Sequence, residues 1–555
     1  MPNKLRIFAL GGLDENGKNM YVVEINDDIF VLEAGIKYPE SSMPGIDMII
    51  PDVGYLIKNK KRVKGYFISH GHDDIMGALP YVLNDVPAPI YCSRITAELI
   101  MSSAKRYKLN VNFDFRIAAP NSKSKIDKYD VYYFSTTHSV GESLGIAIDT
   151  GSGLVVYTGD FIIDYGALPQ YRTDVNMLSQ LGDKKVLVLL TESVDCDKPG
   201  HTSPNHKLTP IVENIFSEHK GRILATFYTQ NLFGIREIID LAVKYQRKIV
   251  IYDEEMKHVL GAVSKFGILS IPPTLQLSKD ELNRPGNEDA VIIISGIGEY
   301  LFRTLEQIAG GESDVGLKIK STDMFIIGSP SIPGLEVIST RAIDELYKTG
   351  ANILNIKKKQ LSSMHAHEED IKMMLSIFHP KYYMPVKGEY RHLIANAQIA
   401  VGMQQGYNHK NVFVCDNGMV VTFEDGVYKG LADSVPVGEV MIDGLGIGDV
   451  GSQAINDRQK LSDNGVLILG ITVDTKKKEI IAGPDVQMRG LIFLKDADDF
   501  LKELTQLFQT LVLESLESGN IKFDETKVKI RDKVNFFVRK ATGKDPMVLP
   551  VIVEV

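Results

Sequence analysis

A cluster of metal-binding side chains directly follows one short apolar run, and it constrains the fold more than any other feature of the chain. Residues 63–69 have the composition of a buried strand, and His70, His72 and Asp74 follow within a single turn. Two imidazoles two residues apart on a loop that leaves a strand can reach one ion, and the nearby carboxylate can serve a neighbouring position. The pattern predicts a metal site at the end of a strand.

Two later segments each add one potential ligand at the end of a predicted strand. His138 follows a strand of alternating polarity near residues 131–135, and Asp160 follows the apolar run 154–158. Taken singly, such a histidine is more often a hydrogen-bonded structural residue, and a Gly-Asp pair is more often a turn. Beside the first cluster, both become candidate metal ligands.

Composition limits the class of protein. The chain has 555 residues, of which 44% are hydrophobic and 24% charged, which is typical of a globular protein of about three domains. Its longest apolar runs have the length of strands, and the N-terminus enters a predicted strand without a signal-peptide apolar region. We therefore expect a cytoplasmic protein that does not enter a membrane.

Cysteine content and net charge exclude further classes. Cys92, Cys196 and Cys415 are far apart and odd in number, so neither a disulfide framework nor a Cys-x-x-Cys zinc module is supported. The net charge of -9 provides no general attraction for nucleic acid. Any RNA binding must come from a local basic groove and depend strongly on salt.

The rhythm of the predicted elements changes along the chain. Short strands dominate residues 1–207, helices alternate with buried strands over 208–363, and residues 364–434 return to the first pattern. A Gly-rich stretch near 435–455 reads as a linker. Residues 456–555 form an α+β module with two long amphipathic helices, near 496–517 and 525–540.

Taken in order, these segments resemble the metallo-β-lactamase hydrolases, and further motifs narrow the resemblance to the β-CASP nucleases and then to the ribonuclease J family. The resemblance covers nearly the whole chain. Besides His70–Asp74, it rests on Ala9-Leu10-Gly11-Gly12, Gly17-Lys18-Asn19, Gly45-Ile46-Asp47, Ile50-Pro51-Asp52, His138-Ser139, Thr158-Gly159-Asp160-Phe161, Pro385-Val386-Lys387-Gly388-Glu389-Tyr390-Arg391, Pro546-Met547-Val548-Leu549-Pro550 and Glu554-Val555.

The resemblance implies an α/β fold class. We expect a metallo-β-lactamase αββα sandwich over 1–207 and 364–434, an inserted β-CASP α/β domain over 208–363, a linker over 435–455 and a C-terminal α+β association domain over 456–555. It also implies an RNA substrate. Active members of the family remove nucleotides from the 5′ end of RNA, can cut internally, and use two metal ions.

The ligand set implied by the family is complete for one ion only. The first position would use His70, His72, His138 and the bridging Asp160, and all four are present. The second position would use Asp74, Asp160 and two histidines. Those two histidines are replaced here by Ile75 and Lys387. We expect zinc or manganese, with at most one tightly bound ion.

Lys387 is also a candidate substitute for the missing cation. A protonated ammonium has no lone pair and cannot ligate a metal, but it can place one positive charge between Asp74 and Asp160. The alternative is an unremarkable lysine that points to solvent. Ile75 is an apolar filling residue in either case.

Other positions implied by the resemblance have changed as well. The family's first motif reads Glu33-Ala34-Gly35, and the acidic residue of its first β-CASP motif is Glu192. Of the segment that binds RNA phosphate, Ser363 and His365 remain, while His367 reads as a surface histidine. The expected catalytic residues are Asp74, Asp160, Glu192 and His365, and the expected RNA- or phosphate-binding residues are Ser363, His365, Lys357 and Lys358.

Three functional hypotheses follow. The first is a weakly active ribonuclease, and the second is a non-catalytic subunit that assembles with an active ribonuclease J paralogue. The third is a hydrolase of small esters, which the inserted domain and the C-terminal module argue against. We expect weak intrinsic activity together with a role as partner subunit in RNA maturation and decay. We also expect self-association through the C-terminal domain.

Overall fold

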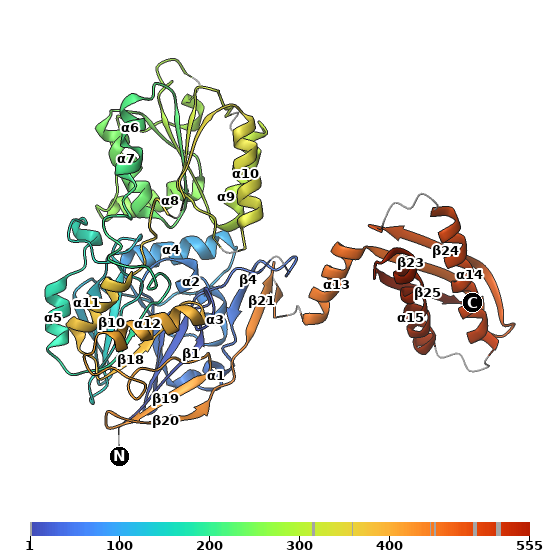
Figure 1. Cartoon of the computed structure of the whole chain (residues 1–555), viewed down its shortest axis with the longest axis horizontal. Helices are drawn as coiled ribbons and strands as arrows, with labels where there is room; N and C mark the ends of the chain where they lie inside the picture. Colours follow the sequence, from blue (N-terminus) through green and yellow to red (C-terminus); the bar gives the residue numbers. More distant parts are fainter. Residues whose placement is uncertain are drawn as a thin grey trace. The chain divides into compact units, whose positions relative to one another are not determined.

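The computed structural model describes residues 3–40, 42–282, 284–313, 317–332, 334–357, 359–444, 446–448, 451–491, 497–517 and 523–555. These residues form two compact units. The first comprises Met1–Tyr38 and Met48–Val440, and the second comprises Pro39–Asp47 and Met441–Val555 (Figure 1).

The first unit is built on two facing β-sheets. The eight-stranded sheet has the order β20-β19-β1-β2-β3-β5-β6-β7, and the six-stranded sheet has the order β18-β12-β11-β10-β9-β8. The strands of the first sheet are β1 Lys4–Gly11, β2 Met20–Ile25, β3 Asp28–Leu32, β5 Val63–Phe67, β6 Ile90–Cys92, β7 Phe115–Ile117, β19 Met419–Glu424 and β20 Val427–Ser434. Those of the second are β8 Ser122–Ile126, β9 Tyr129–Ser135, β10 Leu144–Asp149, β11 Leu154–Tyr157, β12 Val186–Thr191 and β18 Tyr382–Pro385.

Side chains from both sheets form one core between them. Phe30 and Phe67 of the first sheet meet Tyr133, Ile146 and Leu190 of the second. This continuous burial explains why the central strands are apolar on nearly every residue. The turn between β2 and β3 consists of two residues, Asn26 and Asp27. Asn26 takes the positive φ that such turns require.

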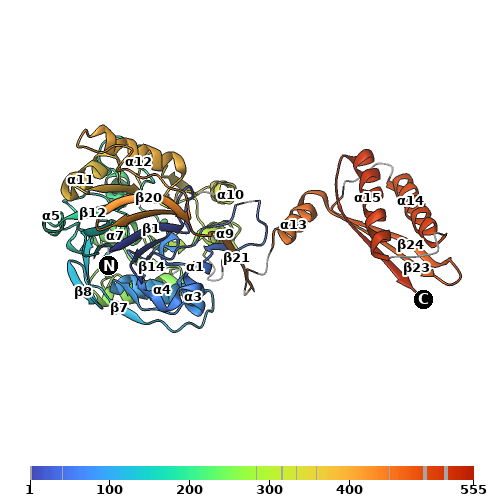
Figure 2. The ribbon, with the colours of Figure 1, turned by 90° about the horizontal axis from the view of Figure 1, so that it is seen from below.

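Helices cover the outer faces of the sandwich. Leu178, Ile371, Leu375 and Ala400 pack on the outer face of the six-stranded sheet, and they come from α5, α11 and α12. Figure 2 shows α3 and α4 on the opposite side of the sandwich from α11 and α12. The helices are α1 Gly54–Lys58, α2 Asp73–Met76, α3 Leu79–Asp85, α4 Arg94–Arg106, α5 Val175–Gly182, α11 Glu368–Phe378 and α12 Tyr390–Gly402. The predicted αββα fold is confirmed.

A five-stranded parallel sheet forms the inserted domain, as predicted. Its order is β14-β15-β13-β16-β17, so the first strand in the chain, β13, lies in the centre. The strands are β13 Ile223–Tyr228, β14 Ile249–Ile251, β15 Val291–Gly296, β16 Met324–Ile327 and β17 Asn352–Asn355. The helices are α6 Thr209–Glu218, α7 Leu232–Lys244, α8 Glu254–Lys265, α9 Gly298–Ala309 and α10 Glu336–Lys348.

In the second unit, two long helices pack on one face of a three-stranded sheet of order β24-β23-β25. Leu467 and Leu469 of β23 are buried under them, whereas Ile468 on the other face is 37% exposed. The elements are α13 Ser452–Asn464, β23 Val466–Asp474, β24 Glu479–Arg489, α14 Ala497–Glu517, α15 Phe523–Thr542 and β25 Met547–Glu554. Both predicted long helices are present.

The segment 435–455, expected to be a linker, contains more regular structure than its glycine content indicated. It includes β21 Glu439–Asp443, β22 Gly446–Ile447 and the beginning of α13. A further strand, β4 Met48–Pro51, and three short 3-10 helices, Lys60–Arg62, Pro169–Tyr171 and Lys279–Glu281, complete the described elements. Among the helices in the described ranges, none is both long and apolar enough to cross a bilayer.

Candidate metal centre

Four potential ligands meet where strands of the two sheets end. His70 and His72 lie in the turn between β5 and α2, His138 follows β9, and Asp160 follows β11. Because β5 belongs to one sheet and β9 and β11 to the other, the sandwich itself brings the three segments together. One ligand atom from each of the four residues lies within 4.8 Å of all the others.

The inward atoms of the four residues fit a divalent ion. The His70 and His138 Nε2 atoms are 3.5 and 3.7 Å from the Asp160 Oδ2 atom, and His138 Nε2 is 3.3 Å from His72 Nδ1. Among the described residues, His70 Nε2 and Asp160 Oδ1 are buried without any hydrogen-bond partner. Buried polar atoms rarely lack a hydrogen-bond partner, so these two atoms are available to bind a metal ion. Three imidazoles and one carboxylate form a complete set for zinc.

The outward nitrogen of each histidine is held by another group. Ser69 Oγ lies 2.9 Å from His70 Nδ1, Ser139 Oγ lies 2.9 Å from His72 Nε2, and the Met364 carbonyl lies 2.7 Å from His138 Nδ1. Such contacts fix the ring orientation and leave the inner nitrogen for a metal. Sequence reasoning did not single out these roles, although Ser139 stands beside His138.

Burial also sets the protonation state of the three rings. It lowers the pKa of His70 and of His138 well below the usual value, and it lowers the pKa of His72 to about 4. All three are therefore neutral near pH 7, which is the form that binds metals.

A buried lysine lies beside the cluster, at one of the two positions where the resemblance implied a lost histidine. Lys387 follows β18, is 3% exposed, and has its Nζ atom 2.5 Å from Asp160 Oδ2 and 2.8 Å from Asp74 Oδ2. Burial alone would lower the pKa of Lys387, but the two carboxylates raise it above its usual value. The ammonium is charged and lies between the carboxylates, so a lysine that points to solvent is excluded.

Ile75, the other position where the resemblance implied a lost histidine, lies in α2 and is completely buried. Its side chain has no donor atom for a metal. The cluster thus combines three neutral histidines, two carboxylates and one ammonium.

Glu192 and His365 form a hydrogen-bonded pair beside the cluster. His365 Nδ1 is 2.5 Å from Glu192 Oε2 and 3.8 Å from Asp160 Oδ2. Although burial alone would lower the pKa of His365, the adjacent carboxylates raise it to about 9. Since its side chain is 19% exposed, His365 presents a positive charge at the edge of the cluster.

Glu33 lies behind the cluster. Its Oε2 atom accepts a hydrogen bond of 3.1 Å from the backbone N–H of Ser69, and burial raises the pKa of its carboxyl group to about 8. Glu33 therefore supports the turn that carries His70 and is mostly protonated at neutral pH.

The remaining predicted residues lie in different settings. The Ser363 hydroxyl donates to the Asp195 carboxylate, which also pairs with Lys198 at 2.9 Å. Lys357 is exposed. Lys358 lies outside the described residues. The interpretation of His367 as a surface histidine is wrong, because it is only 5% exposed.

Family comparisons cover most of the chain. The description "Metallo-beta-lactamase superfamily" matches residues 13–195, and "Zn-dependent metallo-hydrolase RNA specificity domain" matches 354–414. "Ribonuclease J, beta-CASP domain" matches 220–346, and "Ribonuclease J C-terminal domain" matches 453–555. The chain is 32% identical over 551 residues to Ribonuclease J 2 of Staphylococcus epidermidis, which covers 99% of this chain and 98% of the relative. The chain belongs to the ribonuclease J family.

Other relatives agree with this assignment. Ribonuclease J 2 of Staphylococcus aureus is also 32% identical over 551 residues, covering 99% of this chain and 98% of the relative. A crystal structure of a protein of unknown function from Enterococcus faecalis V583 superimposes with a TM-score of 0.53 at 15% identity, covering 76% of this chain and 100% of the other. The latter likeness shows a shared fold.

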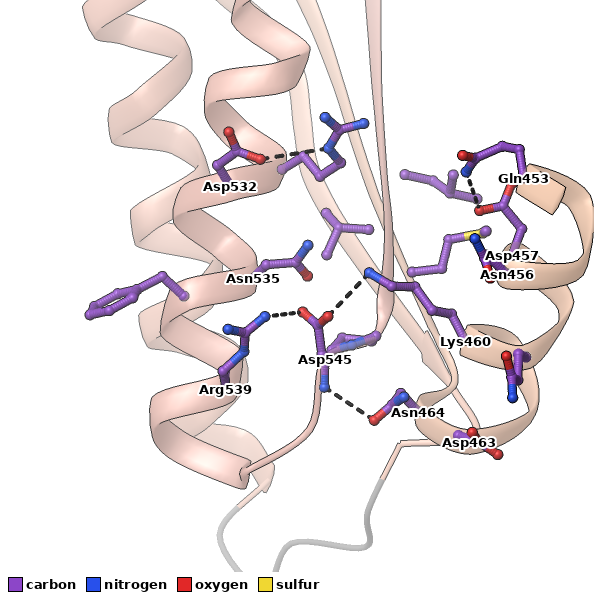
Figure 3. Close-up of a pocket in the computed structure, with 17 residues that line it drawn as sticks. Gln453, Asn456, Asp457, Lys460, Asp463, Asn464, Asp532, Asn535, Arg539 and Asp545 are labelled. Carbon is purple, nitrogen blue, oxygen red and sulfur yellow. Dashed lines mark hydrogen bonds and ion pairs between the residues drawn. The ribbon is translucent and has the colours of Figure 1, made fainter. Parts of the chain in front are cut away.

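A groove of 980 Å³ lies within the second unit, lined by α13, α15 and the beginning of β25 (Figure 3). Its walls carry both signs of charge. Lys460 and Arg539 both pair with Asp545, at 3.1 and 2.9 Å. The charged side chains of the groove thus pair with one another across it. The candidate metal ligands, in contrast, all come from the first unit.

Proposed function

We propose that this chain is an RNA-processing protein of the ribonuclease J type with weak intrinsic hydrolytic activity. It acts mainly as a partner subunit of an active ribonuclease J paralogue in the maturation and decay of rRNA and mRNA in the cytoplasm. The observation that carries the proposal is the Lys387 ammonium, which contacts both Asp74 and Asp160. It neutralises the carboxylates that a second ion would need.

One ion fits the remaining ligands, His70, His72, His138 and Asp160, with zinc or manganese as the candidates. When bound, such an ion supplies Lewis-acid polarisation of a phosphate ester and lowers the pKa of water. The chain lacks two of the imidazoles that complete a second position, so the attacking and leaving oxygens are not both held by metal. Slow hydrolysis follows from this loss.

The chain's own groups can still bind and orient RNA. His365 presents a positive charge held by Glu192, and it can donate a hydrogen bond to a phosphate oxygen. Ser363 lies two residues away, but its hydroxyl is engaged by Asp195. Phosphate binding therefore competes with an internal carboxylate. Lys357 and Lys358 remain proposed contacts to the RNA backbone.

Association is proposed to use the second unit. On the face of its sheet that the helices leave uncovered, Leu549, Val551 and Val553 are 43, 47 and 50% exposed. A row of three such side chains on an edge strand is typical of a surface that another protein covers. We propose that this row contacts a further ribonuclease J chain, either the active paralogue or a second copy.

One observation favours a second candidate, a subunit without any catalytic activity. Lys387 pairs with Asp160, the same carboxylate that the first ion would use. If the ammonium holds Asp160, only the three histidines of the proposed ligand set are available to bind an ion. Hydrolysis of small esters is not favoured, because the family matches extend through the β-CASP and C-terminal domains.

Metal analysis and a nuclease assay on the same preparation test the proposal. We expect at most one zinc or manganese ion per chain, slow turnover of 5′-monophosphorylated RNA, and co-purification with an active ribonuclease J. Two ions per chain together with fast turnover would refute it. Zero ions with no turnover would favour the inactive subunit.

A further inference from the structure

A loop of the inserted domain contacts two of the metal-binding segments. The segment called loop 229–233 follows β13, the central strand of the five-stranded sheet, and includes the first two residues of α7. Loops at the carboxyl end of a central parallel strand are where such sheets place their functional groups. Here the loop meets the turn that carries His72 and the segment that carries His138.

The first contact is made by Gln230. Its Nε2 group donates a hydrogen bond of 2.7 Å to Asp73 Oδ1, while the Tyr38 hydroxyl donates one of 2.8 Å to Asp73 Oδ2. Asp73 is 4% exposed and lies between His72 and Asp74 in the sequence. A buried carboxylate held from both sides fixes the backbone of the turn around it.

The second contact is made by the backbone N–H of Phe233, which donates a hydrogen bond of 2.9 Å to the carbonyl of Ser139. Ser139 follows His138 directly, and its Oγ atom lies 2.9 Å from His72 Nε2. The Phe233 ring packs edge-on against Tyr171, which anchors the loop in place. The inserted domain thus holds the residue that orients His72.

From these two contacts we infer that loop 229–233 positions the metal ligands, so that the affinity for a divalent ion depends on the placement of the inserted domain. Neither Gln230 nor Phe233 touches the ion. They act through Asp73 and Ser139 on His72 and His138. By linkage, an ion at the site strengthens the contact between the two domains in return. The inference rests on the single-ion site of the proposed function.

The test measures cobalt(II) affinity and the visible absorption of the bound ion, on full-length protein stripped of metal and without RNA. Gln230→Ala and the length-matched Gln230→Met should each lower the affinity about tenfold and shift the absorption bands. The control is Gln246→Ala, since this exposed amide lies in the inserted domain and donates its hydrogen bond of 3.0 Å to the nearby Val243 carbonyl. It should bind cobalt as the wild type does.

A double-mutant cycle shows whether Gln230 acts through Asp73. If it does, the variant that combines Asp73→Asn with Gln230→Met should bind cobalt(II) with the same affinity as the weaker-binding of the two single variants. The melting temperatures of the metal-free variants show whether a substitution destabilises the whole protein. Only variants that melt at the wild-type temperature are used in the double-mutant cycle.

Wild-type affinity in both Gln230 variants, or losses that multiply in the double variant, would overturn the inference alone. A wild type that binds no cobalt would overturn it together with the metal site of the proposed function. The two failures are distinguishable because only the second is seen before any residue is changed.

Discussion

Supplying two imidazoles beside Asp74 and Asp160 should create a second metal position. The change is Ile75→His combined with Lys387→His, which supplies the donors that the family resemblance implies at these two positions. We expect the double variant to bind two manganese or zinc ions per chain and to degrade 5′-monophosphorylated RNA faster than the wild type. The gain should be partial, because Ser363 is still engaged by Asp195.

Coulomb energies explain why Ile75→His alone should do little. The Lys387 ammonium lies 2.5 and 2.8 Å from the carboxylates that would bind the second ion, so that ion would lie on the order of 4 Å from a positive charge. At an effective dielectric constant of about 20, a divalent ion is repelled there by about 8 kcal/mol. One added imidazole does not offset a repulsion of that size. Lys387→His alone removes the repulsion but leaves one ligand missing.

The assay is metal content by mass spectrometry, paired with exonuclease turnover, on the wild type, both single variants and the double variant. A double variant that binds no second ion would refute the reading of residues 75 and 387 as lost ligand positions. A double variant that binds two ions but cleaves no faster would place the defect in RNA binding. In that case Asp195→Asn, which removes the carboxylate competing for Ser363, becomes the decisive addition.

Three further outcomes are expected. Glu33 is protonated in the folded metal-free chain up to about pH 8 and ionises near pH 4.5 when unfolded, so its own contribution to the free energy of unfolding should fall across that window by up to about 1.4 kcal/mol per pH unit. Denaturant titrations of the wild type and of Glu33→Gln should differ by that slope, because the contributions of the histidines are common to both. Ser139→Ala should weaken zinc binding about tenfold in a competition assay, while Ser139→Thr, which keeps the hydroxyl, should restore most of it. Leu549→Lys with Val551→Lys should reduce the mass measured by light scattering to that of a monomer, whereas Gln487→Lys, on β24 at the opposite edge of the same sheet, should not.

The sequence allowed the strand-end ligands to be predicted because their spacing is local. His70, His72 and Asp74 share one turn, and His138 and Asp160 each close a strand with a clear apolar pattern. The parallel sheet of the inserted domain was equally clear, except for β17, whose residues Asn352–Asn355 carry too little apolar character to be recognised.

Contacts between distant segments could not be predicted in the same way. Ser69, Ser139 and the Met364 carbonyl support the three histidines only because the sandwich and the inserted domain bring them there. Nor does any local pattern distinguish a buried His367 from an exposed one. The exact domain boundaries, the residue roles and the partner chain stay predictions.

The backbone around Lys387 does not depend on the identity of its side chain. The backbone around it is fixed by hydrogen bonds that do not involve its side chain: the Val386 N–H donates to the Thr191 carbonyl at 2.9 Å, and the Ser193 N–H donates to the Lys387 carbonyl at 3.0 Å. Exchange of an imidazole for an ammonium therefore changes the charge pattern and leaves the loop in place. Because two buried or partly buried carboxylates without a cation would repel each other, a covalently attached positive charge removes the need for the second ion. The folded state then depends on a residue that cannot dissociate, which is consistent with the proposed role as a partner subunit.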